Sequence, residues 1–166
     1  MTTVTLSDNI TTIGAKAFNC GLTTGIGKVQ IDALPKSLTT IGATAFRALG
    51  NLTITSIPDG VTSIPDECMQ YCPQVRIDTF GGGNSKLTSI GSSAFDGSGQ
   101  GRTPIENIYL HSGVKTLGKR CFQNYGSSTG PKMLITENSD DNVDWVITDI
   151  CGASTTATIS YDWTGA

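Results

Sequence analysis

The sequence is poor in the residues on which most catalytic and nucleic-acid-binding sites depend. It holds one histidine, 15% charged residues and 7% aromatic residues. A Ser-His-Asp or Cys-His set would have to be built on that single histidine. The 11 basic residues are scattered along a chain of net charge −3 and form no stripe that would neutralise a row of phosphates. We therefore expect no catalysis, no nucleic-acid partner and no cofactor.

Long apolar segments are also missing. No apolar run reaches the length that crosses a bilayer, so we expect no membrane insertion. The first residues lack the basic and then apolar stretch of an export signal. Two locations stay open at this point: the cell surface if a leader has been removed, and a virion if the chain is made whole in the cytoplasm.

The five cysteines do not indicate a disulfide framework, because an odd number leaves at least one unpaired. Cys68 and Cys72 are four residues apart and could supply two metal ligands, but the sequence offers them no second Cys or His pair. We expect buried thiols instead, and we expect the single histidine, His111, to be a turn residue. The acidic stretch 139–144 lacks the alternating ligands and the central glycine of a calcium loop, so no metal site is predicted.

The sequence does contain one phrase repeated five times. Each copy has an isoleucine or leucine at its centre, followed by glycine or proline and then by a small and a larger apolar residue. The five copies are Ile10–Phe18, Leu38–Phe46, Val61–Met69, Leu87–Phe95 and Val114–Phe122. A unit this short cannot bury its own apolar face, so successive units must stack and share one core.

Apolar or small residues recur four, five and eight residues after the central isoleucine, as at Ile41, Ala45, Phe46 and Leu49. This spacing is typical of one face of a helix of about two turns. The glycine or proline that follows the isoleucine suits a helix start. A strand-like run precedes each phrase and often ends in proline, as in 29–35 and 52–58.

The phrases resemble the BspA-like (Treponema-type) leucine-rich repeats over residues 1 to about 125. The resemblance rests on a strand followed by Leu/Ile-Pro-x-x-Val-Thr-x-Ile-Gly-x-x-Ala-Phe. It implies an α/β repeat solenoid, with about five strand-plus-short-helix units over residues 1–128. Residues 129–166 break the period and contain three strand-like runs, so we expect a β-rich C-terminal cap or docking element there.

The candidate ligand-binding residues alternate with the buried ones along the strands and should therefore point outward, one repeat above the next. We call this row the strand face; it consists of Gln30, Asp32, Thr53, Thr55, Arg76, Asp78, Asn107 and Tyr109. A row of polar groups with one aromatic ring suits a protein or a glycan. A merely solvated sheet gives the same pattern.

Three functions are compatible with these observations. The resemblance implies a non-enzymatic recognition or scaffolding module that binds protein or glycan, as in bacterial surface adhesion. The alternative is a phage virion decoration or assembly protein, with residues 131–166 available for docking or self-association. An enzyme is the third hypothesis, and it requires clustered acid, base or nucleophilic residues that the repeats do not offer.

Overall fold

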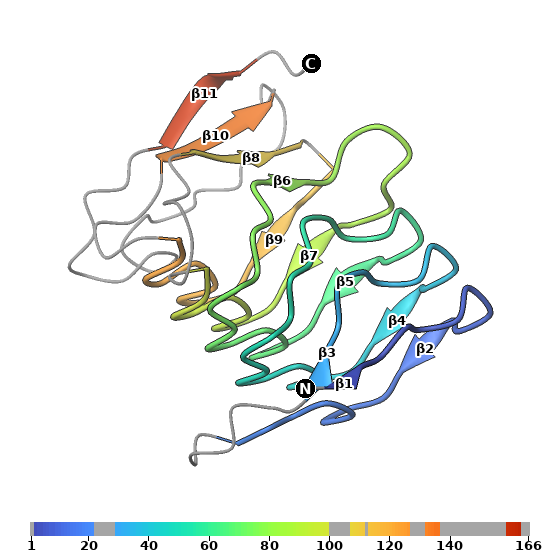
Figure 1. The fold of residues 1–166 in the computed structure, drawn as a ribbon. Coiled ribbons are helices and arrows are strands. Elements are labelled where there is room, and N and C mark those ends of the chain that lie inside the picture. The colour runs from blue at the N-terminus through green and yellow to red at the C-terminus, as the bar shows by residue number, and fades with distance from the viewer. Residues whose placement is uncertain are drawn as a thin grey trace.

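The computed structural model describes residues 2–21, 29–99, 107–111, 113–126, 132–136 and 159–163. In this part of the chain the backbone winds through successive coils that stack in one direction, from the blue N-terminal end to the orange and red strands (Figure 1). We number the coils 1 to 5, and they cover residues 2–21, 29–50, 51–73, 74–99 and 107–126. The repeat solenoid that the sequence predicts is present.

Each coil passes through two strand positions, and every strand pair of the described residues is parallel; the pairs are β1 with β3, β6 with β8, β2 with β4, β5 with β7, β7 with β9, and β10 with β8 and β11. The first strand column contains β1 (Thr2–Thr3), β3 (Val29–Gln30), β6 (Thr79–Phe80), β8 (Asn107–Leu110), β10 (Lys132–Thr136) and β11 (Ile159–Trp163). Coil 3 joins this column through a bridge between Ile31 and Leu52. The second strand column contains β2 (Thr12–Ile13), β4 (Thr40–Ile41), β5 (Ser63–Ile64), β7 (Ser89–Ile90) and β9 (Thr116–Leu117).

The sequence predicts one strand per unit. This is wrong, because the second strand column adds a short strand to each coil. The two polar residues before the central isoleucine form a short strand with it, although the prediction placed this isoleucine at a helix start. In the C-terminal segment, β10 pairs with β8 and β11 pairs with β10, so both extend the first strand column. The predicted strand-like run 143–150 lies outside the described residues.

The predicted two-turn helices are wrong, because the described residues contain no helix. Each of these segments is a run of tight turns, and we call the stack of residues 14–21, 42–49, 65–72, 91–98 and 118–125 the turn column. One position in every coil has a positive φ between 52° and 60°; it is occupied by Lys16, Thr44, Glu67, Ser93 and Arg120. A right-handed helix does not admit a positive φ, so these residues exclude it.

Hydrogen bonds in the turn column alternate between the coil itself and the next coil. In coil 2 the Ala45 N–H donates to the Gly42 carbonyl at 3.2 Å, whereas the Phe46 N–H donates to the Cys68 carbonyl of coil 3 at 2.9 Å. At all four junctions, three N–H groups of the earlier coil donate to carbonyls of the later coil. The backbone of each coil is therefore satisfied only when the next coil is stacked on it.

In coils 2, 4 and 5, glycine follows the central isoleucine or leucine where the coil approaches the preceding one closely, and no helix begins there. A Cβ atom on Gly42 would lie 2.2 Å from the Ala15 nitrogen, and one on Gly118 would lie 2.3 Å from the Ser92 nitrogen. No side chain fits at such distances. The interpretation of this glycine as a helix start is therefore wrong, and close packing between coils explains it in coils 2, 4 and 5.

The predicted buried positions are confirmed, although the conformation is not helical. The central residues Ile13, Ile41, Ile64 and Ile90 are at most 5% exposed, and Leu117 is half-buried. The positions four, five and eight residues after Ile41, Ile64 and Leu117 are fully buried: Ala45, Phe46, Leu49, Cys68, Met69, Cys72, Cys121, Phe122 and Tyr125. Aromatic rings stack along the column, with Phe18 5.6 Å from Phe46 and Phe95 5.7 Å from Phe122 between ring centroids.

Replacing Phe95 by alanine tests this core. The ring is fully buried and contacts the rings of Phe80, Phe122 and Tyr125, so we expect a loss of about 3–5 kcal/mol in the free energy of unfolding. Phe18→Ala is the matched control: it removes the same ring from a half-buried position in coil 1 and should cost less. Chemical denaturation measures both, and a loss below about 1 kcal/mol for Phe95→Ala would mean that the buried face is wrong.

Tyr125 joins the turn column to the first strand column through the core. Its buried hydroxyl accepts from the Ile77 N–H at 2.8 Å and donates to the Ile77 carbonyl at 2.7 Å. Burial is the main cause that raises the pKa of this phenol far above its ordinary value. The hydroxyl thus satisfies both backbone groups of a residue that is itself fully buried.

Tyr125→Phe should therefore leave two buried backbone groups of Ile77 without their hydrogen bonds. We expect a loss of about 1–3 kcal/mol in the free energy of unfolding, with the fold retained because the ring is kept. Urea denaturation of the variant and the parent chain measures this. An unchanged stability would contradict the role assigned to the hydroxyl.

Candidate binding surfaces

The strand face lies on the outer side of the first strand column. The residues that alternate with it point inward, and Ile31, Ile54, Ile77 and Ile108 are at most 1% exposed. Of the eight predicted residues, Asp32, Thr55 and Asp78 are exposed, and the remaining five are half-buried. The structure therefore places all eight where at least part of the side chain reaches solvent.

The structure brings three of these residues into one hydrogen-bonded group. Asp32 accepts from the Gln30 amide at 2.7 Å and from the Thr53 hydroxyl of the next coil at 2.5 Å. These bonds, the one from Thr53 first, lower the pKa of Asp32 below its ordinary value. A fixed carboxylate at this place accepts hydrogen bonds from a ligand through its remaining lone pairs.

Farther along the strand face the alternation is interrupted. Ile77 and Phe80 both point inward, so the two residues between them, Asp78 and Thr79, both face outward. The Thr79 hydroxyl donates to Asp78 at 3.0 Å, and Thr79 lies opposite Tyr109 in the ladder. Strict alternation assigns Thr79 to the core, which is why sequence reasoning missed it.

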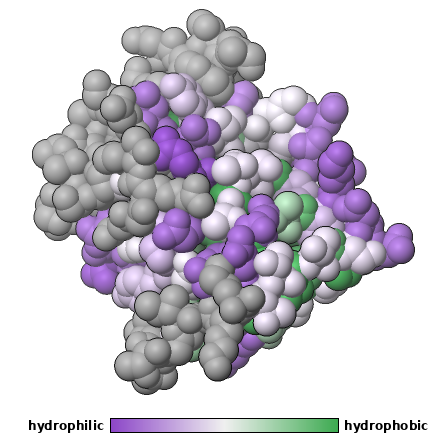
Figure 2. Space-filling view, viewed as in Figure 1, coloured by the Kyte–Doolittle hydropathy of each residue, from purple (hydrophilic) through white to green (hydrophobic). Residues whose placement is uncertain are grey.

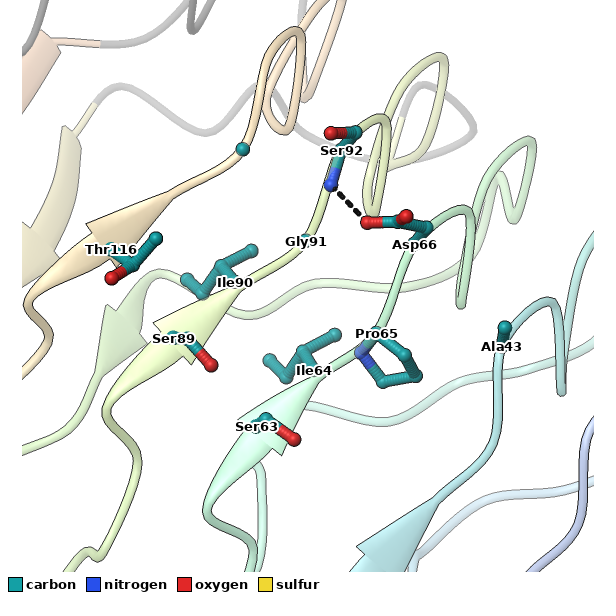
Figure 3. Close-up of a pocket in the computed structure, with 11 residues that line it drawn as sticks. Ala43, Ser63, Ile64, Pro65, Asp66, Ser89, Ile90, Gly91, Ser92 and Thr116 are labelled. Carbon is teal, nitrogen blue, oxygen red and sulfur yellow. Dashed lines mark hydrogen bonds between the residues drawn. The ribbon is translucent and has the colours of Figure 1, made fainter.

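A second surface, which the sequence analysis did not select, lies over the second strand column. Figure 2 shows the face of the solenoid in the view of Figure 1, with weakly polar residues across its middle and a strongly hydrophilic edge at the right. A shallow groove of about 470 Å³ runs over β5, β7 and β9 on this surface. Ser63, Ser89 and Thr116 line it with one hydroxyl from each strand (Figure 3).

Asp66 stands at the end of this groove, on the first turn after β5. Its Oδ1 accepts from the Ser92 N–H at 2.7 Å, which fixes the carboxylate against coil 4 (Figure 3). The sequence signal for the groove is the hydroxyl residue directly before each central isoleucine or leucine, together with Pro65-Asp66 in the third phrase, where the other phrases have glycine after the central residue.

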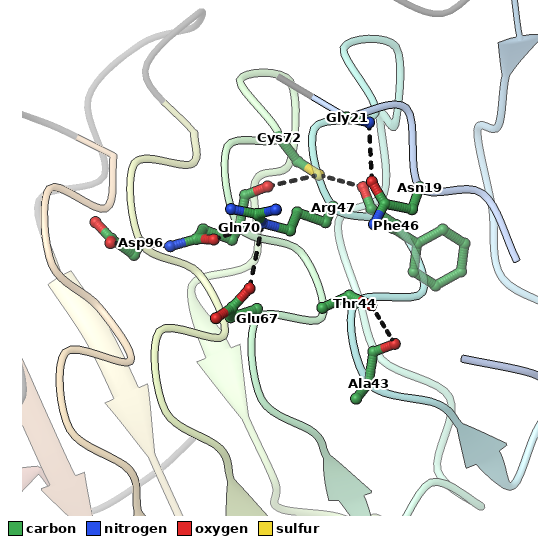
Figure 4. A network of polar contacts seen from close by, with 10 residues as sticks. All are labelled: Asn19, Gly21, Ala43, Thr44, Phe46, Arg47, Glu67, Gln70, Cys72 and Asp96. Carbon is green, nitrogen blue, oxygen red and sulfur yellow. Dashed lines mark hydrogen bonds and ion pairs between the residues drawn. The ribbon is translucent and has the colours of Figure 1, made fainter. Parts of the chain in front are cut away.

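The turn column carries a polar network on its outer side (Figure 4). The Arg47 Nε donates to the Gln70 side chain at 2.7 Å and lies 3.3 Å from the Glu67 carboxylate. Gln70 in turn donates to Asp96 at 3.2 Å, and the Arg47 guanidinium lies 5.9 Å from the centre of the Tyr71 ring. Burial raises the pKa of Asp96, the largest of several influences on it. This network joins coils 2, 3 and 4, and it pairs no nucleophile with a base.

The predicted buried thiols are confirmed at Cys68 and Cys72, both of which are fully buried. Burial raises the pKa of Cys72 to about 12 and that of Cys68 still further. No group of three or more metal-ligating side chains occurs among the described residues. The acidic stretch 139–144 lies outside them.

His111 follows β8 directly and is half-buried. Its ring lies against the backbone of Gly82, where a Cβ would come within 2.3 Å of the imidazole. Partial burial lowers the pKa of His111. The structure thus places this residue in a turn, as the sequence predicts. In the described part of the chain no helix is long and apolar enough to cross a membrane.

Residues 1–129 match the family model described as the BspA type leucine rich repeat region, in six copies. No curated protein matches the chain. The match covers all five phrases and stops before residue 131, where the repeat pattern ends. The sequence analysis counted five units, one for each central isoleucine or leucine, whereas the family model counts six.

The burial of the thiols generates a prediction about their reactivity. Only the thiolate reacts with iodoacetamide, so Cys68 and Cys72 should stay unmodified in the native chain and react once it is unfolded. Cys20 is half-buried and should react first among the described cysteines. Peptide mass spectrometry before and after denaturation assigns each site. Modification of Cys68 in the native chain at the rate of Cys20 would show that the core is not closed around it.

Proposed function

Because the chain belongs to the BspA-type leucine-rich repeat family, we propose that it is a non-enzymatic recognition module of the bacterial surface-adhesion type. The family is one of protein-interaction repeats, and its solenoid presents extended surfaces in place of a closed pocket. The observation that supports this proposal most directly is the strand face. Eight polar or aromatic side chains there project from a rigid parallel column whose inward residues are fully buried.

The strand face has the composition of a protein-binding surface. Arg76 and Tyr109 belong to the residue types that most often contribute strongly at interfaces. Gln30, Asp32 and Asp78 add hydrogen-bonding groups to the same face, and Asp32 is already held in place by Gln30 and Thr53. A surface that is ordered before binding loses less conformational entropy when a partner docks.

Residues 131–166 are proposed as a docking element. β11 is the last strand of the first column and pairs only with β10 in the described part of the chain. An edge strand of this kind offers backbone groups to a strand of a partner. The element and the strand face belong to the same column, so one extended partner has access to both.

Replacing Arg76 and Tyr109 by alanine, singly and together, tests the proposed site. The probes are immobilised fibronectin, fibrinogen, laminin and collagen, and whole bacterial cells. We expect each substitution to weaken binding by about tenfold with the fold intact. Thr12→Ala on β2 is the control, because Thr12 lies on the second strand column and is exposed. Binding that both single variants retain in full would move the site away from the strand face.

A further inference from the structure

The second strand column is divided between coils 2 and 3. β2 and β4 form one sheet, and β5, β7 and β9 form another. At the two neighbouring junctions, the N–H groups of Thr39 and Thr88 donate to the carbonyls of Thr11 and Thr62, both at 2.9 Å. No corresponding bond joins Thr62 to Thr39. We call this unbonded line between β4 and β5 the seam.

Pro65 accounts for the seam in two ways. Gly42, Gly91 and Gly118 each donate their N–H to the isoleucine carbonyl of the preceding coil, at 2.7 to 2.8 Å. Pro65 occupies the same position in coil 3 and has no N–H to give to Ile41. Its ring also needs space at a point where the other coils accept only glycine. Coil 3 therefore cannot close onto β4 as the other coils close onto their neighbours.

Contacts along the turn column, which begins at Pro65, keep coils 2 and 3 together. Three turn-column bonds cross this junction, from Thr44, Phe46 and Ala48, at 2.8 to 3.1 Å. The Arg47 side chain adds its contacts to Glu67 and Gln70 on the same side. The junction is thus bonded along the turn column and open along the second strand column.

The groove described above begins at this seam, with Ala43 on one side and Pro65 on the other (Figure 3). Several of its polar groups can make further hydrogen bonds. The hydroxyls of Ser63, Ser89 and Thr116 make no hydrogen bond within the described residues, and only Oδ1 of Asp66 is engaged. Neighbouring strands lie about 4.8 Å apart, so the three hydroxyls follow one another at regular steps.

We propose that this groove, held open by Pro65, binds a neutral, linear oligosaccharide. Hydroxyl groups donate and accept at once, and a sugar chain supplies partners of both kinds to the three hydroxyls and to the Asp66 carboxylate. The groove volume of about 470 Å³ lies within the range of small-ligand sites. No Lys or Arg lines the groove and one carboxylate does, so an anionic ligand is disfavoured.

This site is independent of the strand face, which lies on the other strand column. It adds a glycan site to the proposed recognition module, on residues that the strand-face variants do not touch. Failure of one proposal therefore leaves the other standing.

Titration of the isotopically labelled chain by NMR tests the site. The probes are cellotetraose, maltotetraose and chitotetraose, with tetragalacturonate as the anionic counterpart. At least one neutral probe should give saturable shifts confined to the amides of Ser63, Asp66, Ser89 and Thr116, and tetragalacturonate should bind more weakly than that probe. Absence of saturable shifts with all three neutral probes overturns the proposal.

Two variants test the residues. Asp66→Asn keeps an oxygen for the Ser92 N–H but removes the charge, and Ser89→Ala removes one hydroxyl; each should weaken binding, Asp66→Asn by about tenfold. Thr12→Ala removes an equivalent hydroxyl outside the groove and should bind as the parent chain does. Equal affinity of Asp66→Asn, Ser89→Ala and the parent chain contradicts the assignment.

Pro65→Gly tests the cause of the opening. The substitution restores the residue type of the other coils, so the new amide at position 65 should donate to Ile41 and be protected from hydrogen exchange. Binding of the neutral probe should then be lost. Protection with binding retained contradicts the groove as the site, and an unprotected amide contradicts the role of Pro65.

Discussion

The structure depends on backbone hydrogen bonds that each coil makes to the next. In the turn column, N–H groups alternate between partners in their own coil and partners in the next coil, while Gly42, Gly91 and Gly118 donate to the preceding coil. A single coil therefore has unsatisfied groups on both sides, and stacking is what completes it. The close approach this requires restricts one position to glycine in coils 2, 4 and 5. The outward side chains of the strands take no part in these backbone bonds and are free to vary.

The buried positions could be predicted from the sequence, whereas the backbone conformation could not. Ile41, Ala45, Phe46 and Leu49 are all at most 5% exposed, as the spacing indicated, because burial depends only on which side a residue faces. A short helix and a run of tight turns both place residues four, five and eight apart on one side. The distinguishing feature is the positive φ at residues such as Lys16, and lysine carries no sequence signal for it.

The candidate sites were also predicted only in part from the sequence. Simple alternation along a strand placed the eight strand-face residues at positions that reach solvent, but it assigned Thr79 to the core, because the outward pair Asp78 and Thr79 interrupts the pattern. The groove was missed for another reason. Its strands are two residues long, and such short strands show no periodicity. Their hydroxyl residues were visible in every phrase, but the predicted strand ended before them and the predicted helix began after them, so they were assigned to neither.

The departures of coil 3 from the repeat are coordinated, and this is the strongest reason to regard them as functional. Pro65 removes a hydrogen bond to coil 2, and Met69 stands where coils 1, 2, 4 and 5 have phenylalanine. Both changes fall in coil 3: Met69 is fully buried in the core, and Pro65 lies at the junction with coil 2. Arg47, Glu67 and Gln70 strengthen it on the turn column. Natural sequences break their local rules chiefly at functional sites, with compensation nearby. The lost hydrogen bond at Pro65 and the contacts that offset it fall within one junction, next to a groove whose Ser63, Ser89 and Thr116 hydroxyls make no hydrogen bond within the described residues.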